Sequence, residues 1–305
     1  MDSVNGARSK GATVAVLAYL FASMVFAVAA LPGNAQQPSS SGPRQTPSPV
    51  PRPSQAKPPA KVQPGLTTRG RTISTPSAAQ SNDPQQLLAA GQTALEQNRP
   101  EEAVRLYNRV IVLSANKPET AATAHLKIGN VYMAQRKFEN AAFGFQRAID
   151  LNPNYAEAYN NLGEALGEMK QYQRAIEVFN KAVVLDPRLL KAKYNQAVSY
   201  DRMRNFRYSE FVFRTLIKNN PQYSLAYDGL AVTLSKAGRP KEAIAFHEKA
   251  IALAPQDASY YFNLGISYLM MGNAAKASEQ QEKLKAIDPV IAGRLASVIV
   301  KRQMN

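Results

Sequence analysis

A spacing of 34 residues runs through the last two-thirds of this 305-residue chain and limits the folds that it can adopt. Prolines recur at this step at Pro153, Pro187, Pro221, Pro255 and Pro289. Two further series keep the step, one through Ala141, Ala175, Ser209, Ala243 and Ala277, the other through Ala148, Ala182, Leu216, Ala250 and Leu284. A fixed period of about 20–50 residues is typical of stacked repeats. The sequence therefore predicts an array in which each repeat packs against its neighbours.

Each repeat has the pattern of two amphipathic helices. In the copy at 156–189, apolar and small residues recur at i, i+3, i+4 and i+7, which places them on one face of each helix. The pattern predicts helices at Ala156–Met169 and Tyr172–Leu185. Asp186 and Pro187 are expected to end the second helix, because proline lacks the amide donor and disfavours helix in the residue before it.

The apolar faces of these helices combine small and large side chains. Gly163, Ala175 and Ala182 are small enough to let helix backbones approach closely. Tyr159 and Phe179 are large, and we expect them to fill the space between repeats. The sequence thus predicts a core that continues from one repeat to the next.

These residues resemble the signature of the tetratricopeptide repeat family, W-x2-L-G-x2-Y, then A-x3-F, then A and P. The first part is matched by Tyr159-Leu162-Gly163-Leu166 and Tyr261-Leu264-Gly265-Tyr268, the second by Ala175-Phe179-Ala182-Pro187 and Ala141-Phe145-Ala148-Pro153. The resemblance covers 84–291 in six units, at 84–121, 122–155, 156–189, 190–223, 224–257 and 258–291. It implies an all-α fold, a right-handed superhelical solenoid with a concave inner groove.

Two units depart from the family pattern. The first unit is 38 residues long, and Asn116–Glu119 is interpreted as an insertion at the turn between repeats. The fourth unit has Gln196 and Ala197 where Leu and Gly are usual, and Ser209 where Ala is usual. We expect looser packing in the fourth unit.

The segment 290–305 is expected to cap the array with a helix at Val290–Gln303. A terminal repeat needs a cover with an apolar inner face and a polar outer face. The expected inner residues are Ile291, Leu295 and Val298, and the expected outer residues are Arg294, Lys301 and Arg302.

The first 35 residues have the composition of a targeting segment. Gly11–Leu31 is uncharged, follows Arg8 and Lys10, and precedes small residues up to Ala35. These features predict a secretory signal peptide at 1–35. An uncleaved membrane anchor is the alternative, because about 20 apolar residues span a bilayer. Both predict export to the periplasm, the cell envelope or the medium, and organellar targeting is a minor third interpretation.

The segment 36–83 is rich in Pro, Ser and Gln, and it holds six basic residues with no acid before Asp83. Such a composition buries too little apolar surface to fold, so we expect a disordered, semi-rigid tether. The net charge of the whole chain is +15. The basic linker therefore also suggests contact with an anionic envelope polymer or a lipid surface.

The resemblance implies that positions 2, 5, 9, 12 and 13 of each first helix line the groove. Carried over, the second repeat contributes Asn130, the third an acidic strip of Glu157, Asn160, Glu164 and Glu168, the fourth Lys191, Tyr194, Asp201 and Arg202, and the sixth an apolar strip of Phe262, Ile266, Leu269 and Met270. An extended peptide with a basic segment beside an apolar one would suit this order. The alternative is that each charged strip is only a solvated helix face.

Some tetratricopeptide domains hold a terminal carboxylate with a clamp of Lys, Asn, Asn, Lys and Arg. Here Asn130, Asn161 and Lys191 match the clamp, whereas Leu126 and Asn195 stand where the first Lys and the Arg belong. We therefore expect the clamp to be incomplete.

The fourth repeat is basic and aromatic. Its basic residues are Lys191, Lys193, Arg202, Arg204, Arg207, Arg214 and Lys218, and its aromatic residues are Tyr194, Tyr200, Phe206, Tyr208, Phe211 and Phe213. Such a mixture can bind nucleic acid by phosphate neutralisation and base stacking. However, Tyr200, Phe206 and Phe213 fall at core positions and are expected to be buried. A protein or an anionic polymer is therefore favoured as the partner of this repeat over nucleic acid.

The sequence offers no candidate for catalysis. Cysteine is absent, which excludes disulfides, thiolate zinc sites and a cysteine nucleophile. His125 and His247 are far apart, and we expect both to be packing residues in positions that usually hold an aromatic. No phosphate loop, nucleophile elbow or metalloprotease motif is present. We therefore predict neither an enzyme nor a cofactor or metal site.

The function predicted from the sequence is a non-catalytic scaffold of the cell envelope that binds a peptide or protein in the groove. The alternative is a module that binds an anionic envelope polymer or the membrane surface through the basic linker and the fourth repeat. Salt separates the two, because electrostatic binding at an exposed surface weakens as ionic strength rises.

Overall fold

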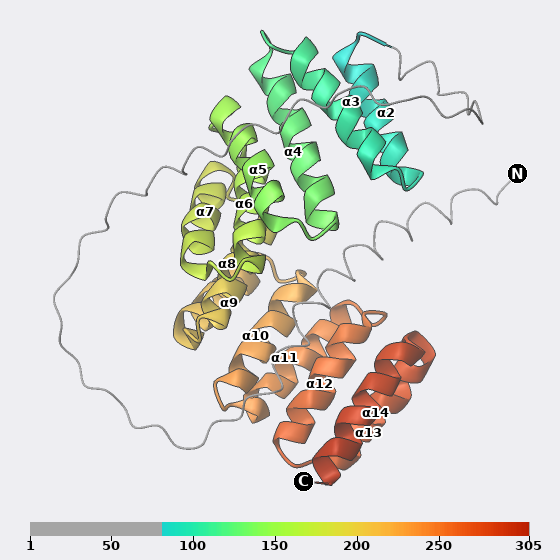
Figure 1. The fold of residues 1–305 in the computed structure, drawn as a ribbon. Coiled ribbons are helices and arrows are strands. Elements are labelled where there is room, and N and C mark those ends of the chain that lie inside the picture. Colours follow the sequence, from blue (N-terminus) through green and yellow to red (C-terminus); the bar gives the residue numbers. More distant parts are fainter. Residues whose placement is uncertain (1–80, 305) are drawn as a thin grey trace, which may run out of the picture. The chain divides into compact units, whose positions relative to one another are not determined.

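The computed structural model describes Ser81–Met304 (Figure 1). The chain divides into two units, Met1–Gly70 and Arg71–Asn305, and the described residues belong to the second. The signal or anchor predicted at 1–35 lies outside the described residues, as does most of the linker predicted at 36–83. Between Ser81 and Met304, no helix is both long enough and apolar enough to cross a bilayer.

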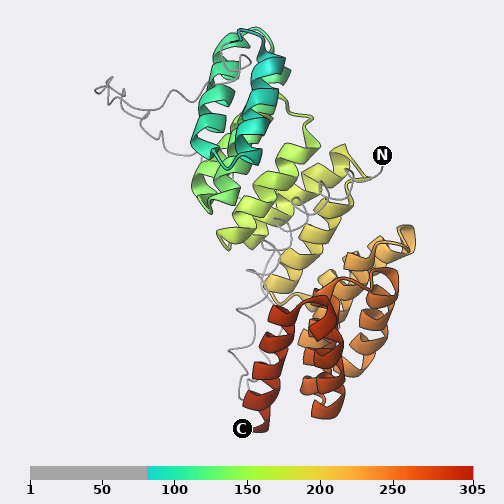
Figure 2. The same ribbon diagram turned by 90° about the vertical axis from the view of Figure 1, so that its right-hand side faces the viewer.

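Within Ser81–Met304 the fold consists of thirteen α-helices and contains no strand, which confirms the all-α class (Figures 1 and 2). The helices are α2 (Pro84–Glu96), α3 (Pro100–Leu113), α4 (Pro118–Ala134), α5 (Phe138–Leu151), α6 (Ala156–Glu168), α7 (Tyr172–Leu185), α8 (Leu190–Arg202), α9 (Phe206–Asn219), α10 (Ser224–Lys236), α11 (Pro240–Leu253), α12 (Ala258–Met270), α13 (Ala274–Ile287) and α14 (Pro289–Gln303). Consecutive helices from α2 to α13 form six pairs, one for each predicted repeat.

Local sequence signals set the helix ends. Helices α2, α3, α4, α11 and α14 each begin with proline, whose missing amide would be unpaired in the first turn in any case. The carboxylate of Asp288 caps α14 by accepting hydrogen bonds from the backbone amides of Val290 (2.9 Å) and Ile291 (3.0 Å). Helix α7 ends at Leu185 and Asp186 is extended, as its place before a proline predicts.

The sequence pattern led to a wrong prediction of where the additional residues of the first unit lie. We expected Asn116–Glu119 to enlarge the turn between repeats, but α4 begins at Pro118 and is 17 residues long. The first helices of the later repeats are 13 residues long. Most of the additional length therefore extends α4 at its N-terminus, because proline is tolerated in the first helical turn.

The helices of the second to sixth repeats fall into two sets that pack differently. We call α4, α6, α8, α10 and α12 the first helices and α5, α7, α9, α11 and α13 the second helices. Each second helix packs against the first helix of its own repeat and, where another repeat follows, against the next first helix. Neighbouring first helices also contact one another, whereas the described second helices have no comparable contact. The first helices thus form a continuous layer, whose open side we call the first-helix face.

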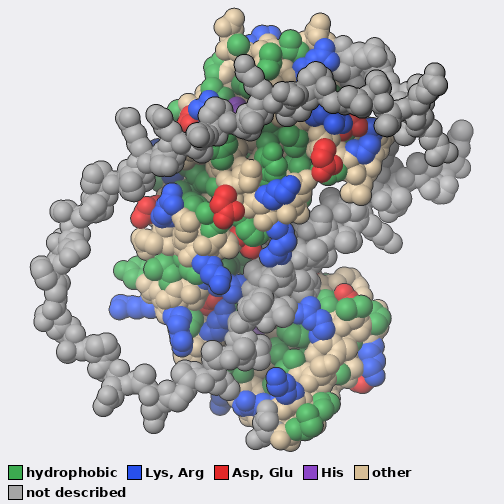
Figure 3. Space-filling view, in the orientation of Figure 1, with side chains coloured by type: hydrophobic (Ala, Val, Ile, Leu, Met, Phe, Trp, Pro, Cys, Tyr) green, Lys and Arg blue, Asp and Glu red, His purple; other side chains and the backbone are tan. Residues whose placement is uncertain are grey.

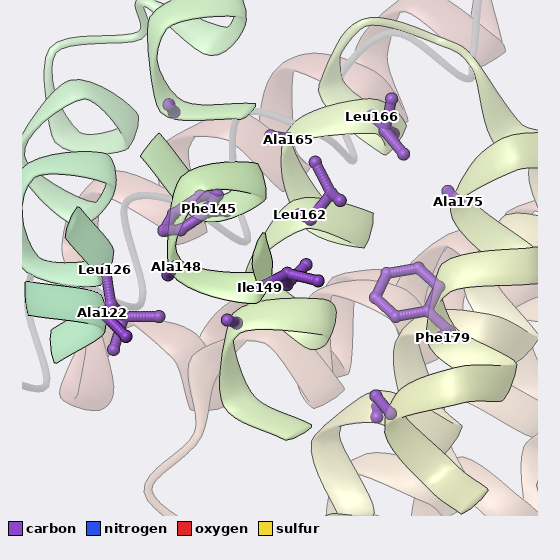
Figure 4. Close-up of a cluster of buried hydrophobic side chains, with 14 residues drawn as sticks. Ala122, Leu126, Phe145, Ala148, Ile149, Leu162, Ala165, Leu166, Ala175 and Phe179 are labelled. Atoms are coloured by element: carbon purple, nitrogen blue, oxygen red, sulfur yellow. The ribbon is translucent and has the colours of Figure 1, made fainter. Parts of the chain in front are cut away.

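A glycine in the first helix makes room for an aromatic ring of the second helix. A Cβ atom placed on Gly163 of α6 would lie only 2.5 Å from Cε1 of Phe179 in α7. Figure 4 shows Phe179 pointing from α7 toward the helix that carries Leu162. Gly163 therefore accommodates a ring of its own repeat, whereas we had expected it to serve backbone contact and Phe179 to fill a gap between repeats.

The fourth repeat, where we expected looser packing, keeps a buried core. Ala197 and Phe213 are 0% and 1% exposed. Ala197 carries a Cβ where the first three repeats have glycine, and the ring of Phe213 lies against Gly229 of the next repeat, where an added Cβ would come within 2.5 Å of its Cζ atom. Gly229 thus compensates for Ala197.

The last helix, α14, covers the sixth repeat as the fold class predicted. Ile291 and Leu295 are buried, but Val298 is only half-buried and Ile299 is buried in its place. Arg294 does not simply face water, because its guanidinium carbon lies 5.7 Å from the ring centre of Phe262 in α12.

Candidate partner-binding face

A chain of side-chain hydrogen bonds crosses three first helices. Asn161 Nδ2 donates to Asn130 Oδ1 (2.9 Å), Asn160 Nδ2 donates to Asn161 Oδ1 (3.0 Å), and Asn195 Nδ2 donates to Asn160 Oδ1 (3.2 Å). We call these four residues of α4, α6 and α8 the asparagine ladder. Asn160 is 2% exposed and Asn161 is 9% exposed, whereas Asn130 is exposed. The ladder therefore has a buried middle and an open end on α4.

Glu164 belongs to the same network and is not a free acid. Its Oε1 atom accepts hydrogen bonds from Asn160 Nδ2 (2.6 Å) and Asn195 Nδ2 (2.9 Å). It also lies 2.8 Å from Nζ of Lys191. The side chain of Glu164 is 13% exposed and that of Lys191 is 58% exposed. The acidic strip expected on the third repeat is thus neutralised at its centre by a lysine of the fourth.

The other two carboxylates of that strip have different surroundings. Glu157 is exposed, at the first turn of α6. Glu168 is half-buried near the end of α6, and burial raises its pKa. The charge of Glu164 acts in the same direction on the pKa of Glu168, whereas the charges of Arg136 and Arg202 oppose it. Only Glu157 offers a fully hydrated carboxylate to a partner.

Residues of the fourth repeat divide between surface and core. Asp201 is 7% exposed and forms an ion pair with Lys236 of α10. Its other carboxylate oxygen, Oδ1, is buried and has no hydrogen-bond partner among the described atoms. Tyr194 is 6% exposed and meets the ring of Phe213 edge-on at 5.6 Å. Tyr194 therefore packs in the core beneath the first-helix face and does not line it.

The sixth repeat gives the face an apolar end. Phe262 and Ile266 are half-buried and Met270 is exposed, whereas Leu269 is buried. At the position of Ile266, the two preceding repeats carry Val198 and Val232, both half-buried. The sequence interpretation missed these valines, although the 34-residue step aligns them with Asn130, Glu164 and Ile266. At this one repeat position the first-helix face thus changes from polar on α4 and α6 to apolar on α8, α10 and α12, although α8 also carries Asn195 of the ladder and the exposed Lys191.

The geometry disfavours a carboxylate clamp. Leu126, at the position of the first clamp lysine, is buried in the core. Lys191 is paired with Glu164, whose negative charge would repel a ligand carboxylate. Asn130, Asn161 and Asn195 are joined through Asn160 into the ladder. The residues that matched the clamp therefore serve a different hydrogen-bonding network.

A second polar network lies inside the fifth and sixth repeats and was not foreseen from the sequence. His247 Nδ1 lies 2.7 Å from Asp228 Oδ1, and its Nε2 lies 3.1 Å from Ser267 Oγ. Asn263 Nδ2 donates to Asp228 Oδ2 (2.8 Å), and Ser267 Oγ lies 2.8 Å from Ser235 Oγ. A Ser–His–Asp order is that of acyl-transfer enzymes, but Ser267 and His247 are 1% and 0% exposed. The arrangement joins α10, α11 and α12 and gives a substrate no access.

The two histidines therefore differ from one another. His247 is buried as expected, but its ring is hydrogen-bonded at both nitrogens instead of packing as an aromatic would. His125 is half-buried, and its pKa is lowered by burial foremost and by the charge of Arg147, against the charge of Asp150. Among the residues from Ser81 to Met304, no group of three or more potential ligands is placed to hold a metal ion.

Family models match most of the described chain. The model described as "TPR repeat" matches residues 129–170, and three models described as "Tetratricopeptide repeat" match 156–189, 248–279, and 88–144 with 194–258. A search of curated proteins gave no match.

Solved structures share the fold at low sequence identity. A tetratricopeptide repeat protein from Parabacteroides merdae ATCC 43184 is 18% identical, covers 72% of this chain and 88% of its own, and has a TM-score of 0.59. PilW, a widely conserved type IV pilus biogenesis factor, is 21% identical, with coverage of 68% and 94% and a TM-score of 0.58. A thermophilic TPR protein of Thermus thermophilus, TTC0263, is 22% identical, with coverage of 59% and 100% and a TM-score of 0.53.

The matched residues lie within the helix pairs α2 to α13, and the solved structures share their fold. The chain belongs to the tetratricopeptide repeat family.

Proposed function

We propose that this chain is a protein-interaction scaffold that binds an extended peptide segment of a partner along the first-helix face. Tetratricopeptide repeat proteins are protein- and peptide-binding modules, which supports the general class. The observation that carries the proposal is the asparagine ladder across α4, α6 and α8. Its buried middle fixes Asn130, the exposed end of the ladder on α4, before any ligand arrives.

The ladder suits the backbone of an extended peptide. An asparagine side chain both donates and accepts hydrogen bonds, as the amides and carbonyls of a peptide require. Asn130 accepts from Asn161 through Oδ1, and its exposed amide nitrogen is placed to donate to a ligand carbonyl. Because the side chains are already fixed by one another, binding orders few additional rotamers and retains more of its free energy.

The change from polar to apolar along the face gives the ligand a direction. Val198, Val232 and Ile266 are half-buried and follow the ladder at successive repeats. The part of the peptide that lies over α10 and α12 would carry apolar side chains, the part over α4 and α6 would be polar, and the change would fall at α8, which carries both Asn195 and Val198. A basic residue of the peptide would meet the exposed Glu157.

We further propose that the scaffold acts by recognition, without catalysis, and that it works in the cell envelope. The support for export is the uncharged run Gly11–Leu31 after Arg8 and Lys10. A fusion of residues 1–83 to a reporter enzyme that is active only outside the cytoplasm tests this location. Activity of the fusion is expected, and a reporter that stays inactive would contradict export.

Peptides selected from a displayed library on the full chain test the binding face. Affinity of the selected peptides is measured for the wild type, for Asn130→Ala and for Asn140→Ala, which removes another exposed asparagine, from α5. We expect Asn130→Ala to weaken binding about tenfold, the equivalent of one lost hydrogen bond of about 1.4 kcal/mol. Equal affinities of the two variants, or loss with Asn140→Ala alone, would contradict the proposal.

A further inference from the structure

Four of the second helices present an outward face made of equivalent positions. In α5, α7, α9 and α11, the same six positions of the repeat are exposed. In α9 these are Arg207, Tyr208, Phe211, Arg214, Thr215 and Lys218. At 100° per residue they cover about 120° of the helix surface, so they form one continuous stripe. We call this stripe the α9 outer face.

The α9 outer face differs in charge from its counterparts. It carries three basic residues and no acid. The equivalent stripe of α7 carries Arg174, Glu177 and Lys181, and that of α5 carries Glu139, Arg147 and Asp150. The stripe of α11 carries two lysines and two glutamates. The repeat fold does not require this excess of positive charge, because the stripes of α5, α7 and α11 occupy the same structural position and carry both acidic and basic residues. Figure 3 likewise shows Lys and Arg side chains gathered over the region of α8 and α9.

The same face exposes two aromatic rings. Phe211 is 66% exposed and Tyr208 is 56% exposed. The ring of Tyr208 stacks on Tyr200 of α8, with 5.5 Å between the ring centres. Tyr208 is therefore held in an outward orientation. Phe143 of α5 is equally exposed, at 65%, but its stripe includes two acids.

Polar contacts leave most of this basic charge facing outward. Arg214 forms an ion pair with Glu210 (2.8 Å) and lies over the ring of Phe246 at 5.4 Å. Glu210 is also paired with Arg239 (2.7 Å), so one carboxylate is shared between two guanidinium groups. Arg207 and Lys218 are exposed on the same stripe, one before and one after Phe211 along α9.

We propose that the α9 outer face is a membrane-contact surface that binds anionic phospholipid. Lysine and arginine are attracted to anionic headgroups, and exposed aromatic rings partition into the boundary between headgroups and acyl chains. The chain also contains Gly11–Leu31, an uncharged run of the length that spans a bilayer. Contact through α9 would leave the first-helix face free, because α9 is a second helix. The surface is thus distinct from the proposed peptide-binding face.

The absence of cysteine makes a local test possible in the full chain. Thr215→Cys introduces a single thiol on the α9 outer face, and Lys181→Cys introduces one at the same repeat position on α7. Each is labelled with a polarity-sensitive fluorophore and mixed with vesicles of phosphatidylglycerol and phosphatidylcholine, or of phosphatidylcholine alone. Insertion of the N-terminal segment would bring both labelled proteins to the vesicles, but it would not by itself place either label in lipid.

We expect the label at position 215 to shift to shorter wavelength with phosphatidylglycerol vesicles only, and the label at 181 to stay unchanged. In the 215-labelled protein, Arg207→Gln with Lys218→Gln is expected to raise the lipid concentration for half the shift about 25-fold, at about fivefold for each basic charge. Lys241→Gln with Lys249→Gln removes the same charge from α11 and should leave that concentration unchanged.

Three results would overturn the assignment. Equal shifts at positions 215 and 181 would show contact without a preferred face. The lack of any shift at 215 would show that α9 does not meet the bilayer. A shift with soluble polyglutamate or a DNA oligonucleotide, but none with vesicles, would assign the face to another polyanion.

Discussion

Leu295 of α14 packs into the space above Gly265 of α12, where an added Cβ would lie 2.7 Å from the leucine Cδ2 atom. In the third repeat the equivalent glycine, Gly163, receives Phe179 from its own second helix. The sixth repeat has Gln281 at the position of that phenylalanine. The last helix therefore supplies a side chain that the sixth repeat lacks.

We predict that Leu295→Ala destabilises the fold by about 2–5 kcal/mol, because it leaves a cavity at a fully buried position. Val300→Ala, on the exposed side of the same helix, should change the free energy of unfolding by less than about 0.5 kcal/mol. Both values come from urea unfolding of the full chain. A Leu295→Ala protein as stable as Val300→Ala would show that α14 does not complete the core.

The ring of Phe213 lies against Gly229, while Ala197 fills the position that receives a ring in other repeats. This arrangement gives a second prediction. Gly229→Ala should cost about 1–3 kcal/mol by overpacking the ring of Phe213. Ala197→Gly should offset part of that loss in the double variant, because it opens the position used in other repeats. Urea unfolding of the four proteins forms a double-mutant cycle. Strictly additive changes would mean that the two positions do not share the ring.

The turn between the two helices of a repeat contains a residue in the left-handed region. Lys170 has φ of 60° and Gly238, two repeats later, has φ of 82°. A side chain disfavours this conformation by about 1–2 kcal/mol. Gly238→Ala should therefore lower the free energy of unfolding by about 1 kcal/mol, although an added Cβ meets nothing within 4 Å.

Lys170→Gly should instead raise stability by up to about 1 kcal/mol, because the relief of strain exceeds the entropy of glycine. Lys181→Gly, in the exposed middle of α7, is the control and should lower stability by about 1 kcal/mol. Loss of stability with Lys170→Gly would show that the lysine side chain contributes more than its backbone strain costs.

Glu168 predicts a dependence of stability on pH. Burial raises its pKa in the folded state, so the folded protein binds this proton more tightly than the unfolded chain. Below its unfolded pKa the group is a neutral carboxyl in both states and causes no penalty, and the stability of the folded state falls as pH rises from the unfolded pKa through the folded pKa. Glu168→Gln should match the wild type at acidic pH and be more stable at pH 7. An advantage that is constant with pH, or a loss at pH 7, would mean that Arg136 and Arg202 dominate over burial.

The fold was predictable because the same pattern of two amphipathic helices recurs in each repeat of the sequence. Tyr172–Leu185 was predicted to the residue, and Ala156–Met169 was one residue too long. The error at Asn116–Glu119 arose because a proline that begins a helix has the same sequence pattern as a proline in a turn. Leu295 was correctly expected to cover the sixth repeat, but the pattern did not show that it takes the space above Gly265, because it comes from a helix outside the repeat.

The candidate site was less accessible to sequence analysis. Position within the repeat placed Asn130, Glu164 and Lys191 on one face, but it did not show that Glu164 and Lys191 neutralise each other. Tyr194 and Leu269 were expected to line the groove and are buried. Charge pairing and burial depend on how neighbouring repeats are set against each other, and one repeat sequence does not specify that geometry.

Photo-crosslinking in cells tests most directly whether the first-helix face binds the partner. A photoreactive amino acid replaces Glu157, exposed on α6, or Glu177, exposed on the outer side of α7. The account predicts a discrete protein adduct from position 157 and none from position 177. An adduct that forms from position 177 and not from position 157 would contradict the account and move the partner to the second helices.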